Sequence, residues 1–281
     1  MSEHFVFANA EGLPLRGDVD APAARGPVVV CVHGFKGFKD WGFWPETAHR
    51  LSDAGYCVVR FNFSHSGVGE DLQSFSETRL FESGTYSAEV ADLRRVVGAV
   101  VAGELPSADR MDASRIGLLG HSRGSVSTLA VAASGEFPVR SVALWNPVSR
   151  VMWWNREERR QWREKGHWEV VNARTRQIFR ISTALLDDAK QNEAALDPAA
   201  NARRLEVPLL AVVASEDESV PAENGIRLAR AAPAGSGSIA EIAGTGHTFG
   251  AVHPFAGATP ALNQAIRSTR EHFEATLWGM K

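Results

Sequence analysis

The sequence has few cysteines and no long apolar run. Its two cysteines, Cys31 and Cys57, each lie within a β-rich apolar stretch, and we expect both to be buried and reduced rather than joined in a disulfide. No uninterrupted apolar run approaches the ~20 residues that a membrane-spanning helix needs. The N-terminus lacks a basic segment followed by an apolar one, so no signal peptide is predicted. These absences predict a soluble cytoplasmic protein without a membrane partner.

The chain also lacks an excess of either charge. Its 281 residues include 30 Lys and Arg against 33 Asp and Glu, a formal net charge of −3, which gives no general attraction to nucleic acid or to anionic membranes. Neither an H-E-x-x-H pattern nor a cluster of Cys and His residues occurs, and metal-dependent hydrolases need such ligands. We therefore expect no nucleic-acid partner, no metal and no other cofactor.

Apolar runs alternate with helix-compatible segments along the chain. Continuous apolar strands are typical of a parallel sheet that is buried on both faces, and their alternation with helices predicts an α/β fold with helices on both faces. The predicted strands are an N-terminal antiparallel hairpin (His4–Ala8, Leu13–Asp18) and then Val28–Val32, Cys57–Phe63, Ile116–Leu119, Val139–Trp145, Val207–Ala214 and Ser238–Ile242. The predicted helices are Pro45–Ala54, Tyr86–Ala102, Ser125–Ala133 and Pro260–Trp278, and Ser64–Glu82 is predicted to be a polar loop. We expect one domain over residues 1–281.

One stretch, between Trp145 and Val207, is too long for a simple crossover. Its parts are a Trp- and Arg-rich segment (Asn146–Arg163), two strand-like runs (Trp168–Val171, Gln177–Ile181) around a turn (Asn172–Arg176), and a helical piece (Thr183–Asn192). Ligands bind at the carboxyl ends of the strands in such sheets. We interpret residues of about 147–192 as a small lid over that edge.

The segment Gly120–Gly124, with the sequence GHSRG, follows a buried strand and precedes a helix. This is the pattern G-x-S-x-G in the context that a nucleophile elbow requires. Ser122 would occupy a sharp, strained turn, with its hydroxyl clear of the main chain, and the two flanking glycines would leave room for the neighbouring strand and helix. We therefore predict that Ser122 is a catalytic nucleophile.

A serine hydroxyl needs a base to remove its proton and a carboxylate to orient that base. In sheets of this type both follow the serine, the acid first and the histidine last, at the ends of later strands. The turn after Val207–Ala214 carries Glu216, Asp217 and Glu218. We expect Asp217 to be the acid, because a Val-Pro pair three and four residues later starts the next helix, and we expect its two neighbours to be solvated.

Nine histidines compete for the role of base. His247 lies in a glycine-flanked turn after the last strand and is the expected base, and His253 is its main rival unless it only packs in that loop. His33 and His121 adjoin the key turns and are expected to brace them by hydrogen bonds. Surface positions are expected for His4, His49, His167 and His272.

Acyl transfer also needs donors for the negative oxygen of the tetrahedral intermediate. One is the backbone N–H of the residue after the nucleophile, here Arg123, and the other comes from the loop after Val28–Val32. In the sequence His33-Gly34-Phe35, the amide of Phe35 is the best candidate.

Together these motifs resemble a serine hydrolase of the α/β-hydrolase superfamily, on the branch of carboxylesterases, cinnamoyl-esterase-like enzymes and serine-aminopeptidase-like enzymes. The resemblance spans Val28 to His247. The segment Phe61–Ser64 resembles the R-F-D-F strand end of the family, with Asn62 in place of the usual Asp. It implies hydrolysis of a small-molecule carboxylic ester through an acyl-serine intermediate, without a cofactor.

Several alternatives to ester hydrolysis are compatible with this sequence. An amide, a peptide or a thioester would be cleaved by the same apparatus. A catalytically silent binding module is a second class, although such relatives usually lose part of the triad. The Trp and Arg residues of the lid could grip single-stranded nucleic acid, but interleaved glutamates favour a solvated helix face.

Tryptophans crowd the region of the lid. They are Trp145, Trp153, Trp154, Trp162 and Trp168. Each could simply pin the insertion to the sheet, but large rings at the mouth of a cleft also supply apolar area with few rotors to freeze. We expect at least one to line the acyl or alcohol pocket, with Trp153 or Trp154 the best candidates.

Overall fold

The computed structural model describes residues 2–172 and 175–279. The strands are β1 (Glu3–Ala8), β2 (Pro14–Asp20), β3 (Gly26–Val32), β4 (Cys57–Asn62), β5 (Met111–His121), β6 (Val139–Trp145), β7 (His167–Val171), β8 (Ile178–Ser182), β9 (Leu209–Ala214) and β10 (Gly237–Ile242). The helices are α1 (Trp44–Asp53), α2 (Thr78–Ser83), α3 (Tyr86–Ala102), α4 (Gly124–Ala132), α5 (Arg156–Lys165), α6 (Ala184–Gln191), α7 (Glu193–Leu196), α8 (Pro198–Arg203), α9 (Glu223–Ala231) and α10 (Pro260–Phe273). A 3₁₀ turn, η1 (Ala108–Arg110), precedes β5, and a π-helical turn, η2 (Glu274–Trp278), extends α10.

Eight strands form one twisted sheet in the order β1-β2-β4-β3-β5-β6-β9-β10. The pairs β1–β2 and β2–β4 are antiparallel, and all the others are parallel. The predicted mostly parallel sheet with an N-terminal hairpin is therefore confirmed. Strand β3 pairs with β4 on one side and β5 on the other, and every one of its residues is buried.

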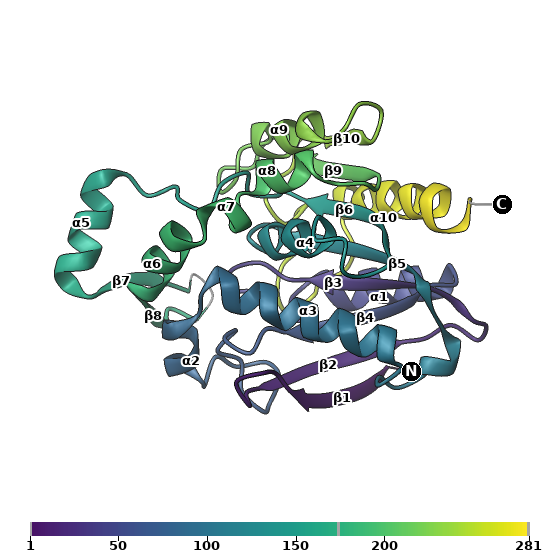
Figure 1. Cartoon of the computed structure of the whole chain (residues 1–281), viewed down its shortest axis with the longest axis horizontal. Helices are drawn as coiled ribbons and strands as arrows, with labels where there is room; N and C mark the ends of the chain where they lie inside the picture. The colour runs from purple at the N-terminus through teal and green to yellow at the C-terminus, as the bar shows by residue number, and fades with distance from the viewer. Residues whose placement is uncertain (1, 173–174, 280–281) are drawn as a thin grey trace.

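Helices cover both faces of the sheet, as predicted (Figure 1). On one face α3, α4, α8 and α9 pack on a cluster that includes Leu93, Val97 and Leu129. On the other face α1 and α10 pack on a cluster that includes Leu51 and Ile266. The cysteines lie in these two clusters as free, buried thiols, and burial raises the pKa of each.

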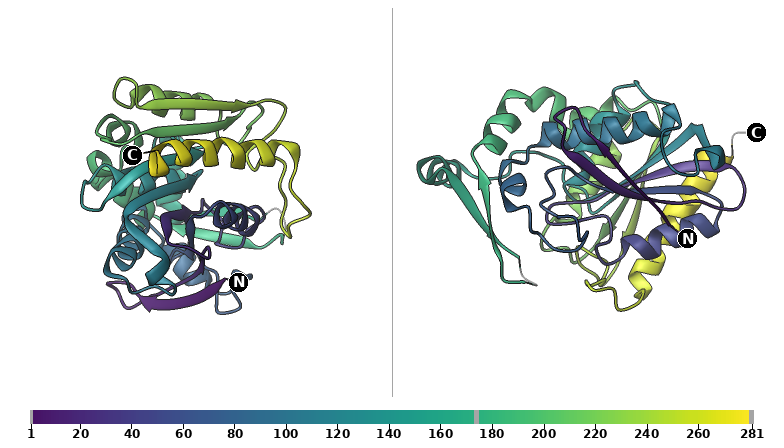
Figure 2. Two further views of the ribbon diagram at one scale, coloured as in Figure 1. Left: turned by 90° about the vertical axis from the view of Figure 1, so that its right-hand side faces the viewer. Right: turned by 90° about the horizontal axis from the view of Figure 1, so that it is seen from below.

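The part of the chain between β6 and β9 that contains α5, β7, β8 and α6 stands off one end of the sheet, at the left of Figure 1 and of the right panel of Figure 2. Helix α5 is capped at its N-terminus by Asn155, whose side chain forms a capping box with Glu158, and at its C-terminus by Gly166 in the left-handed region. Strands β7 and β8 form the expected antiparallel hairpin. The turn predicted at residues 172–176 includes 173 and 174, which lie outside the described residues.

One predicted loop contains a helix. Helix α2 (Thr78–Ser83) lies almost entirely within the stretch 64–82, which the sequence predicts as a polar loop. Its Phe81 is buried, with its ring 4.6 Å from that of Phe179 on β8. This helix depends on a contact with a distant strand, so its local sequence carries no periodic signal. None of the described helices is long and apolar enough to cross a membrane.

Candidate active site

The turn between β5 and α4 holds Ser122 in a strained conformation. Its φ is 54°, which is rare for a residue with a side chain. A Cβ atom on Gly120 would lie 2.4 Å from Oγ1 of Thr128, and one on Gly124 would lie 2.6 Å from the carbonyl oxygen of His33. Both glycines are therefore needed for the close approach of strand, loop and helix. This is the geometry that the G-x-S-x-G pattern predicts.

Three side chains from three strand ends meet at this turn. Nε2 of His247 lies 2.9 Å from Oγ of Ser122, and Nδ1 of the same ring lies 2.6 Å from Oδ2 of Asp217. The sequence-predicted nucleophile, base and acid thus form one hydrogen-bonded chain. The arrangement can pass a proton from the serine hydroxyl to an imidazole that a carboxylate orients.

The turn after β9 orients Asp217, and not its acidic neighbours, toward His247. Its Oδ1 accepts hydrogen bonds from the amides of Ser219 (2.9 Å) and Val220 (2.8 Å), which leaves Oδ2 directed at His247. Burial raises the pKa of this carboxyl, but His247 and the two amides outweigh burial and lower it below its usual value. Glu216 and Glu218 are exposed, as expected.

The loop after β3 lies against the nucleophile. A Cβ on Gly34 would come within 2.9 Å of Cβ of Ser122, so only glycine allows this approach. Phe35 follows and lines a cavity together with Ser122 and His247. The amide of Arg123, just before the first residue of α4, is at a helix N-terminus and has no partner within that helix. Both predicted donor residues therefore border the nucleophile.

The sequence matches the Alpha/beta hydrolase family over residues 29–258. This chain belongs to that family. The match begins in β3 and extends beyond His247, so it includes the elbow, the acid turn and the loop that carries the histidine. A search of curated proteins finds no match.

Solved structures share the fold of this alpha/beta hydrolase at low sequence identity. The alpha/beta hydrolase GrgF from Penicillium sp. sh18 is 18% identical, with a TM-score of 0.73 and coverage of 99% of both chains. Est1E from Butyrivibrio proteoclasticus is 15% identical, with a TM-score of 0.65 and coverage of 96% of each chain. The Pyrococcus horikoshii acylaminoacyl peptidase is 19% identical, with a TM-score of 0.68, and the match covers 100% of this chain but 42% of the peptidase.

Two residues of this alpha/beta hydrolase hold the main chain of His247, and the sequence indicated only one of them. Nε2 of His121 lies 3.1 Å from the carbonyl oxygen of His247, a bracing contact of the predicted kind. The same oxygen accepts a bond from Nδ2 of Asn146 (2.8 Å), whose Oδ1 accepts from the amide of Ala214 (2.8 Å). Asn146 therefore links the ends of β6 and β9 to the histidine loop. No motif marks it in the sequence.

The side chain of Arg123 is a second feature that the motif did not reveal. Its guanidinium lies 4.3 Å from the ring centroid of Tyr86 and 5.6 Å from that of Phe35. Within this cluster, burial raises the pKa of Glu89 on α3 to about 7, although the charge of Arg123 opposes the shift. The guanidinium thus connects the elbow to the loop that carries the second amide donor.

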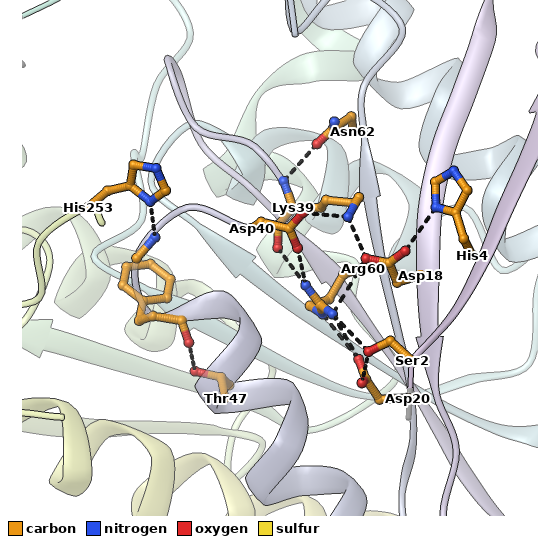
Figure 3. Close-up of polar contacts among 12 residues, drawn as sticks. Ser2, His4, Asp18, Asp20, Lys39, Asp40, Thr47, Arg60, Asn62 and His253 are labelled. Carbon is orange, nitrogen blue, oxygen red and sulfur yellow. Dashed lines mark hydrogen bonds and ion pairs between the residues drawn. The ribbon is translucent and has the colours of Figure 1, made fainter. Parts of the chain in front are cut away.

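A buried ionic network anchors the continuation of that loop to the sheet (Figure 3). Nζ of Lys39 contacts Asp18 and Asp40. Arg60 on β4 donates to the carbonyl of Lys39 over 3.1 Å and pairs with Asp40. Asn62 is the residue that departs from the family pattern, and its Oδ1 accepts a hydrogen bond from the backbone amide of Lys39 (2.7 Å). These contacts fix the loop relative to β2 and β4.

The other histidines have different environments. Nδ1 of His253 accepts a hydrogen bond from the amide of Gly42 (3.2 Å), and the ring of His253 packs on Phe38. His253 therefore packs in its loop and is not among the residues that line the cavity at Ser122. His33 braces its own loop through the carbonyl of Gly34 (2.9 Å). The predictions of surface positions are wrong for two residues, because His167 is half-buried against Glu169 and His272 bonds to Ser141 and Val142.

A cavity of about 420 Å³ opens onto Ser122 and His247. The loop after β3, the segment after β6, and β7, β8 and α6 all contribute lining residues. Trp153, Trp154 and Trp168 are among its lining residues, whereas Trp145 and Trp162 are fully buried. Indole Nε1 of Trp145 donates to Thr269, and that of Trp162 donates to the Ile181 carbonyl. The tryptophans thus divide into a lining set and a packing set.

Proposed function

We propose that this protein hydrolyses carboxylic esters through an acyl-serine intermediate, with Ser122 as nucleophile, His247 as general base and Asp217 as the orienting acid. The observation that carries the proposal is the pair of hydrogen bonds that His247 makes, 2.9 Å to Ser122 and 2.6 Å to Asp217. A base positioned between a hydroxyl and a buried carboxylate has the geometry that acyl transfer requires.

The reaction begins when Nε2 of His247 accepts the hydroxyl proton and Oγ of Ser122 attacks the ester carbonyl carbon. The carbonyl π electrons move to oxygen, and the amides of Phe35 and Arg123 donate hydrogen bonds to that negative charge. When the tetrahedral intermediate collapses, the bond to the alkoxy group breaks and His247 gives its proton to the leaving alcohol. Water then attacks the acyl-serine by the same steps, which releases the acid and restores Ser122.

We propose that residues 1–281 form a single α/β-hydrolase domain in which the insertion of about 147–192 serves as the lid. The lining of the cavity supports this role, because Trp153 and Trp154 from the insertion and Val170 of β7 line the same cavity as Phe35, Ser122 and His247. A cavity of about 420 Å³ falls in the range of small-molecule sites, about 300–1,000 Å³.

A fluorophosphonate label and a panel of p-nitrophenyl acyl esters test the proposal, with matched anilides and thioesters to compare the leaving groups. We expect labelling at Ser122 and faster turnover of esters than of anilides. Ser122→Ala should abolish labelling and remove several orders of magnitude of activity, because the triad acts as a unit. Persistent labelling at another serine would refute the assignment of the nucleophile.

The acid is tested by a matched set of substitutions in one turn. Asp217→Asn should lower kcat by about 10⁴-fold with the fold retained, because it leaves His247 in the wrong tautomer. Glu218→Gln, at the exposed neighbouring position, is the control and should retain nearly full turnover. If Glu218→Gln is the crippling change, the acid has been assigned to the wrong residue.

A further inference from the structure

The cavity at Ser122 has an uneven distribution of charge. Its lining includes three cationic side chains, those of Lys36, Arg123 and Arg150, and no Asp or Glu among the residues that the structure describes. The carboxylate of Asp217 is committed to His247 and two backbone amides. The cavity is otherwise mostly apolar, so a charged ligand group inside it would meet positive potential.

The three cations differ in what already neutralises them. Arg123 forms an ion pair with Glu89. Lys36 donates to the carbonyl oxygen of Val171 over 3.3 Å, which satisfies one N–H group but does not neutralise its charge. Arg150 makes neither a hydrogen bond nor an ion pair with any residue in the described ranges 2–172 and 175–279. Arg150 is exposed, and of the three cations it is the one whose charge and N–H groups are all available to a ligand.

The surroundings of Arg150 also provide space and apolar surface. A side hollow of about 70 Å³ adjoins the main cavity and is lined by Arg150, Trp153 and the acid turn. Arg150, Trp153 and Ser219 line both spaces. The ring of Trp153 is 50% exposed, which is unusual for so large an apolar side chain. A ligand that covered this ring would bring its end beside the guanidinium.

We propose that the substrate is an anionic ester, with an apolar body that lies along Trp153 and Trp154 and a carboxylate that pairs with Arg150. This inference rests on the proposed ester hydrolysis and specifies its substrate class. Arginine suits the role because its N–H groups can bind both oxygens of a carboxylate at once. A charge-assisted contact of this kind contributes enough to change affinity about tenfold or more.

Two pairs of esters test the proposal on the acyl and the alcohol side. The acyl pair is mono-p-nitrophenyl adipate, which carries a free carboxylate, and p-nitrophenyl hexanoate. The alcohol pair is 4-acetoxybenzoate and 4-methylphenyl acetate. The measure is the ratio of kcat/KM for the anionic ester to that for the neutral one, compared between proteins so that the intrinsic reactivities cancel. Arg150→Gln should lower this ratio about tenfold or more for at least one pair, mainly through KM.

Arg156→Gln is the matched control, because Arg156 is an exposed cation at the start of α5 and does not line the cavity. It should leave the ratio unchanged. In 1 M NaCl, where the Debye length is about 3 Å, the ratio of the wild-type protein should fall toward that of Arg150→Gln. If the ratio is equal in wild type and Arg150→Gln for both pairs, the proposal is overturned. It is also overturned if Lys36→Gln lowers the ratio and Arg150→Gln does not.

The failure of the underlying function would give a different pattern, in which no ester of either pair is turned over. Calorimetric binding of the adipate ester and the hexanoate ester to Ser122→Ala protein then tests the carboxylate site without catalysis. The site is supported if the adipate ester binds more tightly than the hexanoate ester and Arg150→Gln abolishes this difference. Equal binding of the two esters would refute it.

Discussion

Nε of Arg123 lies 3.0 Å from one carboxylate oxygen of Glu89 and 3.2 Å from the other. The two side chains are only 11% and 14% exposed, so the pair is largely removed from water. The pair joins the N-terminus of α4, next to Ser122, to the first turn of α3. A buried pair of this kind contributes little net stability over apolar residues, but it is costly to break.

Glu89→Leu should therefore destabilise the protein by about 3–5 kcal/mol, because it leaves the charge of Arg123 buried without a partner. The double variant Glu89→Leu/Arg123→Met should lose less than the sum of the two single changes in urea unfolding. Glu136→Gln, which breaks the exposed pair with Arg94, is the control and should cost less than about 1 kcal/mol. Additive losses at Glu89 and Arg123 would show that the pair is not coupled.

Gly34→Ala should reduce kcat while leaving most of the stability intact. The new methyl group would lie 2.9 Å from Cβ of Ser122 and 3.0 Å from the carbonyl oxygen of His121, so the loop must retreat and carry the Phe35 amide with it. Loss of one such donor typically lowers kcat by about 10²–10³-fold. Gly98→Ala in α3 has its nearest contact at 3.8 Å and should raise stability by up to about 1 kcal/mol with unchanged kcat. Normal turnover by Gly34→Ala would contradict the proposed role of the loop.

Two tryptophans of the proposed lid should respond in opposite ways to alanine substitution. Trp153 lines the cavity and is half exposed, so Trp153→Ala should change the relative kcat/KM for short and long acyl esters without lowering Tm. Trp162 is fully buried, so Trp162→Ala should cost about 3–5 kcal/mol of stability with acyl selectivity retained. Acyl-chain profiles and melting curves of both variants measure the difference. Unchanged selectivity in Trp153→Ala would make that ring a packing residue only.

Mild acid should destabilise the protein through its buried histidines. Burial lowers the pKa of His272 to about 4, whereas in the unfolded chain a histidine binds its proton near 6.5. Between these values the unfolded state binds more protons, so stability that is present at neutral pH is lost as the pH falls, by about 2 kcal/mol at pH 5 for such a residue. The same sign holds for His33 and His121, whose pKa values burial lowers to about 4 and about 3.

His272→Asn should therefore lose less unfolding free energy between pH 7 and pH 5 than the wild-type protein does. The slope is the relevant quantity, because loss of the contacts to Ser141 and Val142 lowers stability at every pH. His49→Asn is the control, since the side chain of His49 is 72% exposed. Equal slopes for His272→Asn and wild type would show that His272 titrates normally in the folded protein.

The contacts of the candidate site could be predicted where chemistry requires a residue type at a strand end. Ser122 and His247 are 125 positions apart, and Asp217 and His247 are 30 apart. The elbow pattern and the order of acid and base nevertheless predicted that these side chains meet, because parallel strands end at one edge. The β-branched runs predicted the central strands for a similarly direct reason: each strand is buried on both faces.

Features that depend on contacts between distant segments, and that no sequence motif marks, could not be predicted. Helix α2 is stabilised by the packing of Phe81 on Phe179. Asn146 can hold the main chain of His247 only because the end of β9 and the histidine loop lie beside it. The partner of Arg123 also comes from a helix more than thirty residues earlier in the chain. The sequence favoured Trp153 and Trp154 as lining residues, but it did not predict that Trp168 also lines the cavity.

The segment between β6 and β9 leaves the sheet and returns to it at strands that are hydrogen-bonded neighbours. Its length can therefore change without any new strand pairing, and the proposed triad residues all lie outside it. The proposed triad and the proposed lid are thus encoded in separate stretches of the gene. If the segment is a lid, grafting it between family members should alter selectivity while the catalytic residues stay unchanged, and substrates can diversify by the same route during evolution.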